Sequence, residues 1–229
     1  GSAGGIYDDR KLRWSDVDLA TVIDNQTKTL TLSVGPTWYQ QCQVDIQREP
    51  AESLKLMSLG IRDHNDPYAY FARGLGISIV PLTIDGHAFL GRRVETKEYK
   101  DCLCFVAGWL DFSDIVNTKN IYDDIERELR EEILLSTPIN LERLRFAGLS
   151  GHPLTGEVDL VYVMQTELSD DHFEETHWPE HTSWLAIRSR EEAEQLLTCG
   201  TIGSLATTYN LTFSCRYSLE YLIHNHWQS

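Results

Sequence analysis

The sequence predicts an α/β architecture of the α+β kind, in which a mixed sheet lies between helices. Two observations carry this prediction. Strand-like and helical segments follow one another in the order strands, helix, strands, helix, and one of the helices has an apolar stripe that repeats every four residues. The chain has 229 residues and shows no internal repeat, so we expect one large domain, or a domain with an extension.

The first half of the chain supplies strands. Residues 27–34 alternate like a strand, and the polar stretch 47–52 follows as a helix or a loop. Residues 76–82 and 87–94 flank Asp85-Gly86, a dipeptide that favours a tight hairpin turn. Residues 103–107 form a further short strand.

The second half begins with the amphipathic helix, over residues 120–134. Its apolar stripe consists of Ile121, Ile125, Leu129 and Ile133. Residues 158–166 and 183–187 are the next predicted strands. Residues 191–197 and 205–223 are predicted to be helical.

The charge of the chain limits the kinds of molecule that it is expected to bind. The formal net charge is −15, so we expect neither nucleic acid nor an anionic membrane surface to bind, because both require basic surfaces. Phosphate-bearing small molecules are compatible with this charge, since a bound metal and a few arginines reverse the field inside a cleft. The sequence does not indicate whether the protein is a monomer or a homodimer.

The sequence also gives indications of the cellular compartment and of how the N-terminus arose. No apolar run approaches the roughly 20 residues of a membrane span, and no secretory signal is visible, so we expect a cytoplasmic protein. The five cysteines form no paired C-x-x-C sites, which favours a reducing compartment. Residues 1–5, Gly-Ser-Ala-Gly-Gly, look like the remnant of an expression tag.

Carboxylates gather on one side of the helix at 120–134. With about 100° per residue, Asp124, Glu128 and Glu131 fall within about 60° of one another, and Glu132 lies about 40° beyond Glu128. Crowded carboxylates repel each other, and hard divalent cations relieve that repulsion. The alternative is a solvated acidic face paired with arginines, and the charge pattern alone leaves both interpretations open.

The segment from Gly108 to Leu135 resembles the Nudix box of the Nudix pyrophosphohydrolases, whose consensus is G-x5-E-x7-R-E-U-x-E-E-x-G-U, with U an aliphatic residue. The residues that match its second half in order and spacing are Arg127, Glu128, Leu129, Glu131, Glu132 and Leu135. Upstream, Gly108-x5-Asp114 looks like the opening, with Asp in place of Glu. The chain departs from the consensus in a longer loop before the helix, in Trp109, and in Leu134, which replaces a glycine.

Segments outside the box are similar in order to the divergent Nudix branch that hydrolyses UDP-glucose and UDP-galactose. They are residues 32–39, 74–77, 89–93 and 180–185. The resemblance implies a Nudix-type α/β/α sandwich over residues 73–229. It also implies an N-terminal extension over residues 6–72 that packs on this core.

The resemblance further implies roles for individual residues. Glu128, Glu131 and Glu132 match the metal-ligand positions for Mg²⁺ or Mn²⁺, the backbone carbonyl near Gly108 often adds a ligand, and Asp114 occupies the opening acid position. Arg127 matches the arginine that holds a box glutamate in place by a charge-assisted hydrogen bond. The general base in this family is a box glutamate or an acid from a later loop, for which Glu180 is the first candidate and Glu157 the second.

Two arginines and four aromatic residues outside the box are further candidates for contacts with a substrate. Arg92 and Arg93 end a predicted strand and should point to opposite faces, so that one could clamp a phosphate while the other is solvated. For the aromatic residues Trp38, Tyr68, Tyr70 and Phe71, core packing is favoured over stacking on a nucleobase.

Two classes of function follow. The first is Mg²⁺-dependent hydrolysis of a nucleoside diphosphate linked to another group, with UDP-sugars, giving UMP and a sugar phosphate, ahead of ADP-ribose and other nucleotide sugars. The second is a catalytically inactive Nudix-fold module that senses a ligand or serves as a scaffold. The three box glutamates favour the enzyme.

Overall fold

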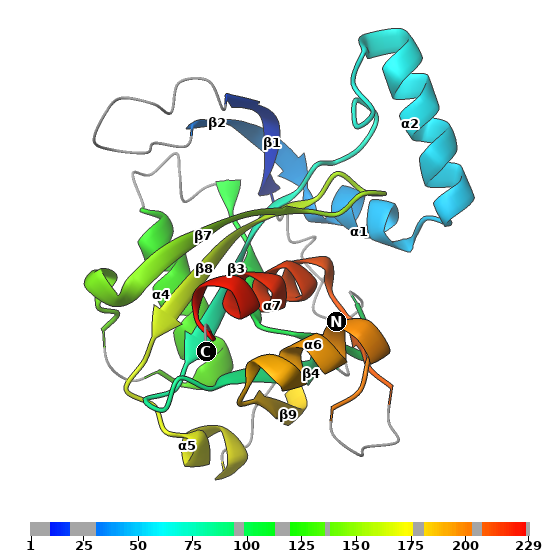
Figure 1. The fold of residues 1–229 in the computed structure, drawn as a ribbon. Helices are drawn as coiled ribbons and strands as arrows, with labels where there is room; N and C mark the ends of the chain where they lie inside the picture. Colours follow the sequence, from blue (N-terminus) through cyan, green and yellow to red (C-terminus); the bar gives the residue numbers. More distant parts are fainter. Residues whose placement is uncertain are drawn as a thin grey trace, which may run out of the picture. The chain divides into compact units, whose positions relative to one another are not determined.

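The computed structural model describes residues 10–18, 31–93, 99–112, 120–135, 138–175, 181–202 and 208–227, and Figure 1 shows their helices and strands. The chain forms two compact units. Unit 1 consists of Gly1–Gly76, Trp109–Asn120 and His152–Val158, and unit 2 of Ile77–Gly108, Ile121–Gly151 and Asp159–Ser229. Residues 6–72, the expected extension, belong to unit 1, and the expected boundary after residue 72 stays a prediction.

The described part of unit 1 contains a two-stranded sheet and two helices. Its elements are β1 (Arg10–Asp18), β2 (Thr31–Trp38), α1 (Tyr39–Gln47) and α2 (Pro50–His64). The two strands pair antiparallel, with a bulge between Trp14 and Asp16, and Leu12 of β1 is completely buried. The indole of Trp14 donates a hydrogen bond to the carbonyl of Gly156 at 2.7 Å, which attaches the segment 152–158 to β1.

Helix α2 has clear start and stop signals. Pro50 occupies its first turn, where the missing N–H costs nothing. The helix ends at Asn65, which adopts the left-handed conformation with φ 56°, a conformation that asparagine tolerates. The polar stretch 47–52, predicted as helix or loop, is the junction between α1 and α2.

Unit 2 is built on the larger, mixed sheet. Its strands are β3 (Leu75–Leu82), β4 (Ala88–Arg93), β5 (Cys102–Cys104), β6 (Val106–Trp109), β7 (Leu144–Gly151), β8 (Val158–Gln165), β9 (His181–Ile187) and β10 (Asn210–Leu211). The strand order is β10-β5-β4-β3-β8-β7, with β6 paired to β3 and β9 paired to β4. Strands β10 and β5 are parallel, whereas β4 pairs antiparallel with β3, β5 and β9.

Helices α6 (Arg190–Cys199) and α7 (Phe213–Asn225) cover one face of this sheet and lie side by side in Figure 1. Ser189 and Thr212 cap their N-termini, each accepting a hydrogen bond from a backbone N–H at 3.3 Å. The core on this face joins strand and helix residues. They are Val80, Leu82, Ala88, Leu90, Leu103, Phe105, Val163, Ile187, Ala193, Leu196, Ile202, Cys215, Leu219, Leu222 and Ile223.

Helix α4 (Ile121–Ile133) and the short helix α5 (Asp170–Glu175) belong to the opposite face. Side chains alternate along a strand, so Phe89 and Gly91 of β4 point away from the core under α6 and α7. Phe89 stacks on Phe173 of α5, with ring centroids 4.6 Å apart. His172 of α5 bonds the carbonyl of Ile133, the last residue of α4. The sheet is therefore covered on both faces, and the predicted α+β class with a sandwiched mixed sheet is confirmed.

Most predicted elements of unit 2 are present. The Asp85-Gly86 hairpin joins β3 to β4, with Gly86 at φ 79°, and the helix predicted at 120–134 is α4. The helix predicted at 205–223 is wrong at its start, because β10 comes first and α7 begins at Phe213. The elements that no pattern predicted are β1, α1, β7 and α5 and most of α2. None of the described helices is long and apolar enough to cross a membrane.

Helix α4 ends in a turn that normally favours glycine. Leu134 adopts the left-handed conformation with φ 51°, and the N–H of Leu135 then bonds the carbonyl of Leu129 at 3.2 Å. A left-handed conformation costs a residue with a Cβ about 1–2 kcal/mol. The helix-ending turn is thus formed although leucine replaces the glycine of the consensus, and the backbone bears the strain.

We expect Leu134→Gly to be neutral or to raise the free energy of unfolding by up to about 1 kcal/mol, because it removes this strain. Leu134→Val should lower it by about 1 kcal/mol, since a β-branched residue fits a positive φ least well. Urea denaturation measures both. Leu54, equally exposed in the interior of α2, is the control: Leu54→Gly should lower stability by about 1 kcal/mol. Equal stabilities of Leu134→Gly and Leu134→Val would contradict the strain.

Candidate active site

The carboxylates of α4 are buried rather than solvated. Asp124, Glu128 and Glu132 lie at successive i, i+4 positions and are only 5, 7 and 2 % exposed. Ile125, Leu129 and Ile133, each one residue further along, are completely buried. The helix thus buries two adjacent stripes, one apolar and one acidic. Because burying a charge without compensation is costly, the solvated-face interpretation is wrong for these three residues.

Arg127 is the cation of this acidic stripe. Its guanidinium lies 2.8 Å from Glu128, 3.4 Å from Asp124 and 3.2 Å from Glu131. Burial lowers the pKa of Arg127, but the three carboxylates outweigh burial and raise it above its ordinary value. Arg127 is therefore charged at any physiological pH and holds Glu128 by a short, charge-assisted contact.

Glu132 is held from two sides. One carboxylate oxygen accepts a hydrogen bond from the backbone N–H of Ala107 in β6 at 3.3 Å. The other lies 3.1 Å from Nε2 of His181, the first residue of β9. Both side chains of the His181–Glu132 pair are almost completely buried, at 1 and 3 % exposure. Two strands of the sheet thereby fix this carboxylate.

Two glycines make room for these contacts. A Cβ on Gly108 would overlap the carboxylate of Glu128, so the side chain of Glu128 lies directly against the backbone of β6. A Cβ on Gly91 would overlap the imidazole of His181. Gly108 therefore lies next to Glu128, and the role of its carbonyl as a metal ligand stays a prediction. Trp109, at the position of a second consensus glycine, packs over Gly74 of the same unit.

Glu131 differs from the other box glutamates. Its side chain is 60 % exposed and bonds Arg127. The three box carboxylates accordingly do not converge on one point in this conformation. A rotation of the exposed Glu131 side chain is required before all three could bind one ion.

The donor set of the site fits a hard divalent cation. Glu128 and Glu132 present buried carboxylate oxygens, and Arg127 lies 2.8 Å from Glu128. Oxygen ligands of this kind suit Mg²⁺ and Mn²⁺. The network carries more negative than positive charge, which a bound cation would offset.

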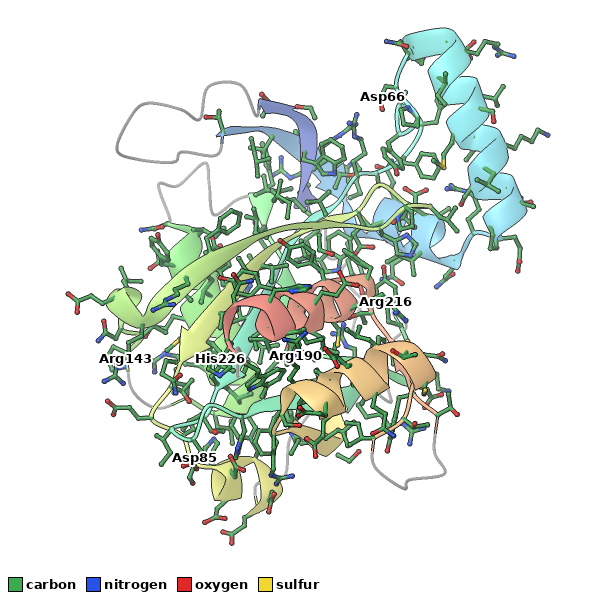
Figure 2. The ribbon with its side chains drawn as sticks, viewed as in Figure 1. Asp66, Asp85, Arg143, Arg190, Arg216 and His226 are labelled. Carbon is green, nitrogen blue, oxygen red and sulfur yellow. The ribbon has the colours of Figure 1, made fainter. Side chains whose placement is uncertain are left out.

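A second group of potential ligands lies at the β3–β4 turn. Asp85, His87 and Asp170 place their ligand atoms within 4.8 Å of one another, and Figure 2 labels Asp85 there. Asp170, however, accepts a hydrogen bond from Thr83 and contacts His87, both at 2.9 Å, and lies 3.5 Å from Arg188. These contacts within the protein account for Asp170 and His87.

The two strand-end arginines have different neighbours. Arg92 pairs with Asp101 at 3.3 Å and is 41 % exposed. Arg93 lies opposite His181 in the β4–β9 ladder. Arg93, and not Arg92, is therefore the strand neighbour of His181, the residue that contacts Glu132. Which of them binds phosphate stays a prediction.

The remaining candidates are Glu157, Asp114 and Glu180. Glu157 is buried in unit 1, where its backbone carbonyl accepts the N–H of His152 at 2.8 Å. Asp114 and Glu180 lie outside the described residues. His181, by contrast, was missed as a functional residue. A glycine in the middle of the buried strand β4, Gly91, was the one signal that a bulky group approaches there.

Comparisons with known proteins give the following similarities. No family model and no curated protein matched the chain. Among solved structures, the MutT protein from Methanosarcina mazei Go1 is similar at 15 % identity, with a TM-score of 0.46, over 67 % of this chain and 95 % of that one. The Nudix domain of NrtR from Shewanella oneidensis, in complex with ADP-ribose, is similar at 13 % identity, with a TM-score of 0.45, over 73 % and 96 %.

We expect Gly108→Ala to lower the affinity for Mn²⁺ at least about tenfold, because the added methyl group displaces the Glu128 carboxylate. Stability should change little, since a carboxylate end can move. Calorimetric titration with Mn²⁺ measures the effect. Gly35→Ala is the matched control, because a Cβ there meets only ordinary contact at 3.9 Å. Unchanged Mn²⁺ affinity in Gly108→Ala would show that Glu128 is not a ligand.

We also expect the His181–Glu132 contact to be strongly coupled. His181→Gln should cost about 1–3 kcal/mol of unfolding free energy, and a double-mutant cycle with Glu132→Gln should give a coupling energy of about 0.5–3 kcal/mol. The exposed pair Glu126–Arg130 on the same helix provides the reference cycle, with about 0.3–0.5 kcal/mol. A coupling no larger than this reference would mean that the buried contact does not position Glu132.

Proposed function

We propose that this chain is a Nudix-type pyrophosphohydrolase. It would hydrolyse a nucleoside diphosphate linked to a sugar, with UDP-glucose-like substrates first, to UMP and a sugar phosphate. The observation that carries this proposal is the burial of Glu128 and Glu132 on α4, at the spacing of the Nudix box. Arg127 forms an ion pair with Glu128, whose carboxylate lies against the backbone of Gly108, and the backbone N–H of Ala107 donates a hydrogen bond to Glu132.

This burial supports a functional site over a charged surface. A helix that needed carboxylates only for solubility would expose them, whereas here the sheet and His181 hold them away from water. Burying three carboxylates is unfavourable unless cations and hydrogen-bond donors compensate them, and a divalent cation would add to what Arg127, Ala107 and His181 provide. We infer that the ligand is Mg²⁺ or Mn²⁺, held by Glu128, Glu132 and, after rotation of its side chain, Glu131.

The chemistry divides between the ion and the protein. A bound Mg²⁺ or Mn²⁺ supplies electrostatic stabilisation of the diphosphate and lowers the pKa of bound water. Arg127 orients Glu128, and the backbone N–H of Ala107 and the imidazole of His181 orient Glu132. In the reaction, the water oxygen forms a bond to one phosphorus, the bridging P–O bond breaks, and the proton passes to a general base.

The general base is proposed to be a carboxylate that solvent can reach. Glu131 meets this requirement, since it is 60 % exposed and next to the buried pair. Glu180 directly precedes His181 in the sequence and is the alternative from outside the box. Glu157, the second candidate base from outside the box, would instead bind the substrate if Glu131 or Glu180 is the base. Arg93 or Arg92 would bind a phosphate oxygen as a cation.

The decisive experiment is a panel of nucleotide sugars assayed with and without Mg²⁺. We expect UMP to be released from UDP-glucose and UDP-galactose in the presence of Mg²⁺, with ADP-ribose as the competing substrate. Glu132→Gln should abolish turnover, because it removes a buried negative charge from the site. Glu126→Gln on the same helix, where Glu126 bonds only Arg130 among described residues, should leave turnover unchanged.

Each result has a distinct meaning. Hydrolysis of ADP-ribose alone would retain the pyrophosphohydrolase and replace the substrate. Mn²⁺ binding without hydrolysis of any nucleoside diphosphate derivative would favour the inactive, ligand-sensing module. If neither metal binding nor hydrolysis is observed, the assignment of α4 as an active-site helix is wrong.

A further inference from the structure

Unit 1 contains a pocket at the point where β2 passes into α1. Its volume of about 570 Å³ lies in the range of small-molecule sites. The residues that line it include Arg13 of β1, Trp38 at the end of β2, Arg48 after α1, and Tyr70. We propose that this pocket binds a small anion that carries an aromatic ring, such as a nucleoside 5′-monophosphate.

Arg13 supplies an uncompensated positive charge. In the part of the chain that the structure describes, Arg13 forms no ion pair, and its Nε is buried without a hydrogen-bond partner. The neighbouring Arg73 is paired instead, with Asp66, at 2.6 Å. Burial and the charge of Arg73 lower the pKa of Arg13, and Asp66 offsets this only in part. A bound anion would offset both the energetic cost of burying the Arg13 charge and its repulsion by Arg73.

The charged lining of the pocket is positive overall. It consists of Arg13, Arg48 and a single carboxylate, Asp45. One oxygen of Asp45 lies 2.6 Å from Arg48, and the other accepts the N–H of Ala72 at 2.6 Å. The carboxylate is therefore fully engaged and does not neutralise Arg13. A local excess of positive charge in a chain of net charge −15 favours a specific anion over general electrostatic attraction.

Two aromatic residues of the lining present exposed surface. Trp38 and Tyr70 are 43 and 45 % exposed, so the prediction that they pack in the core is wrong for both, whereas Phe71 is buried. Tyr70 is fixed in place by its hydroxyl, which donates to Asp63 at 2.9 Å, and by an edge-on contact with His64. Aromatic faces next to guanidinium groups are the usual means of binding a base and its phosphate together.

The proposal is independent of hydrolysis, so its test is a binding measurement without metal. The full-length chain is titrated calorimetrically with UMP and with AMP in the presence of EDTA, where the α4 carboxylates repel phosphate. We expect one equivalent of nucleotide to bind, and uridine or inorganic phosphate alone to bind at least about tenfold more weakly, because each lacks one of the two contacts.

Three variants locate the binding. Arg13→Gln and Trp38→Leu should each weaken UMP or AMP binding at least about tenfold. Lys55→Gln, which removes one exposed positive charge from α2 outside the pocket, should leave it unchanged. Trp38 is half exposed, so its variant reports on the pocket even if Arg13→Gln fails to fold. The absence of nucleotide binding in EDTA, or binding that neither Arg13→Gln nor Trp38→Leu weakens, would overturn the proposal.

Discussion

The burial of carboxylates on α4 is the constraint on which the rest of unit 2 depends. A helix that hides Glu128 and Glu132 must bring their compensating groups with it, and unit 2 provides them from separate strands. Backbone of β6 meets both residues, and His181 of β9 meets Glu132. The sheet therefore positions charge as well as packing apolar side chains. At Glu132, this arrangement makes the stability of unit 2 and the proposed metal affinity parts of the same network.

The elements with a strong periodic signal could be predicted from the sequence. The four-residue repeat of isoleucine and leucine defined α4 within one residue at each end, and Asp85-Gly86 defined the β3–β4 hairpin. Strand β8 was equally clear, because both of its faces are buried and its residues are apolar except for Asp159 and Gln165. In each case the local pattern and the tertiary environment require the same residues, so local reasoning was sufficient.

The other features depend on contacts between distant segments. Strand β7, with exposed Arg145 and two glycines, lacks the alternation of a half-buried strand. Angles around a helix placed Glu131 among the other carboxylates, but burial is decided by what packs on the helix, and Glu131 is left in solvent. The contact between Glu132 and His181 joins residues 49 positions apart in the sequence. No periodic pattern in the residues before His181 indicates this contact.

Leu134 has a consequence for the way such sites are recognised. The helix-ending turn is a property of the backbone, defined by a positive φ and the bond from Leu135 to Leu129. Glycine is the residue that adopts it most readily, but it is not the only one that can. Motifs written as residue letters therefore exclude chains that reach the same conformation at an energetic cost. A description written in dihedral angles and hydrogen bonds would include them.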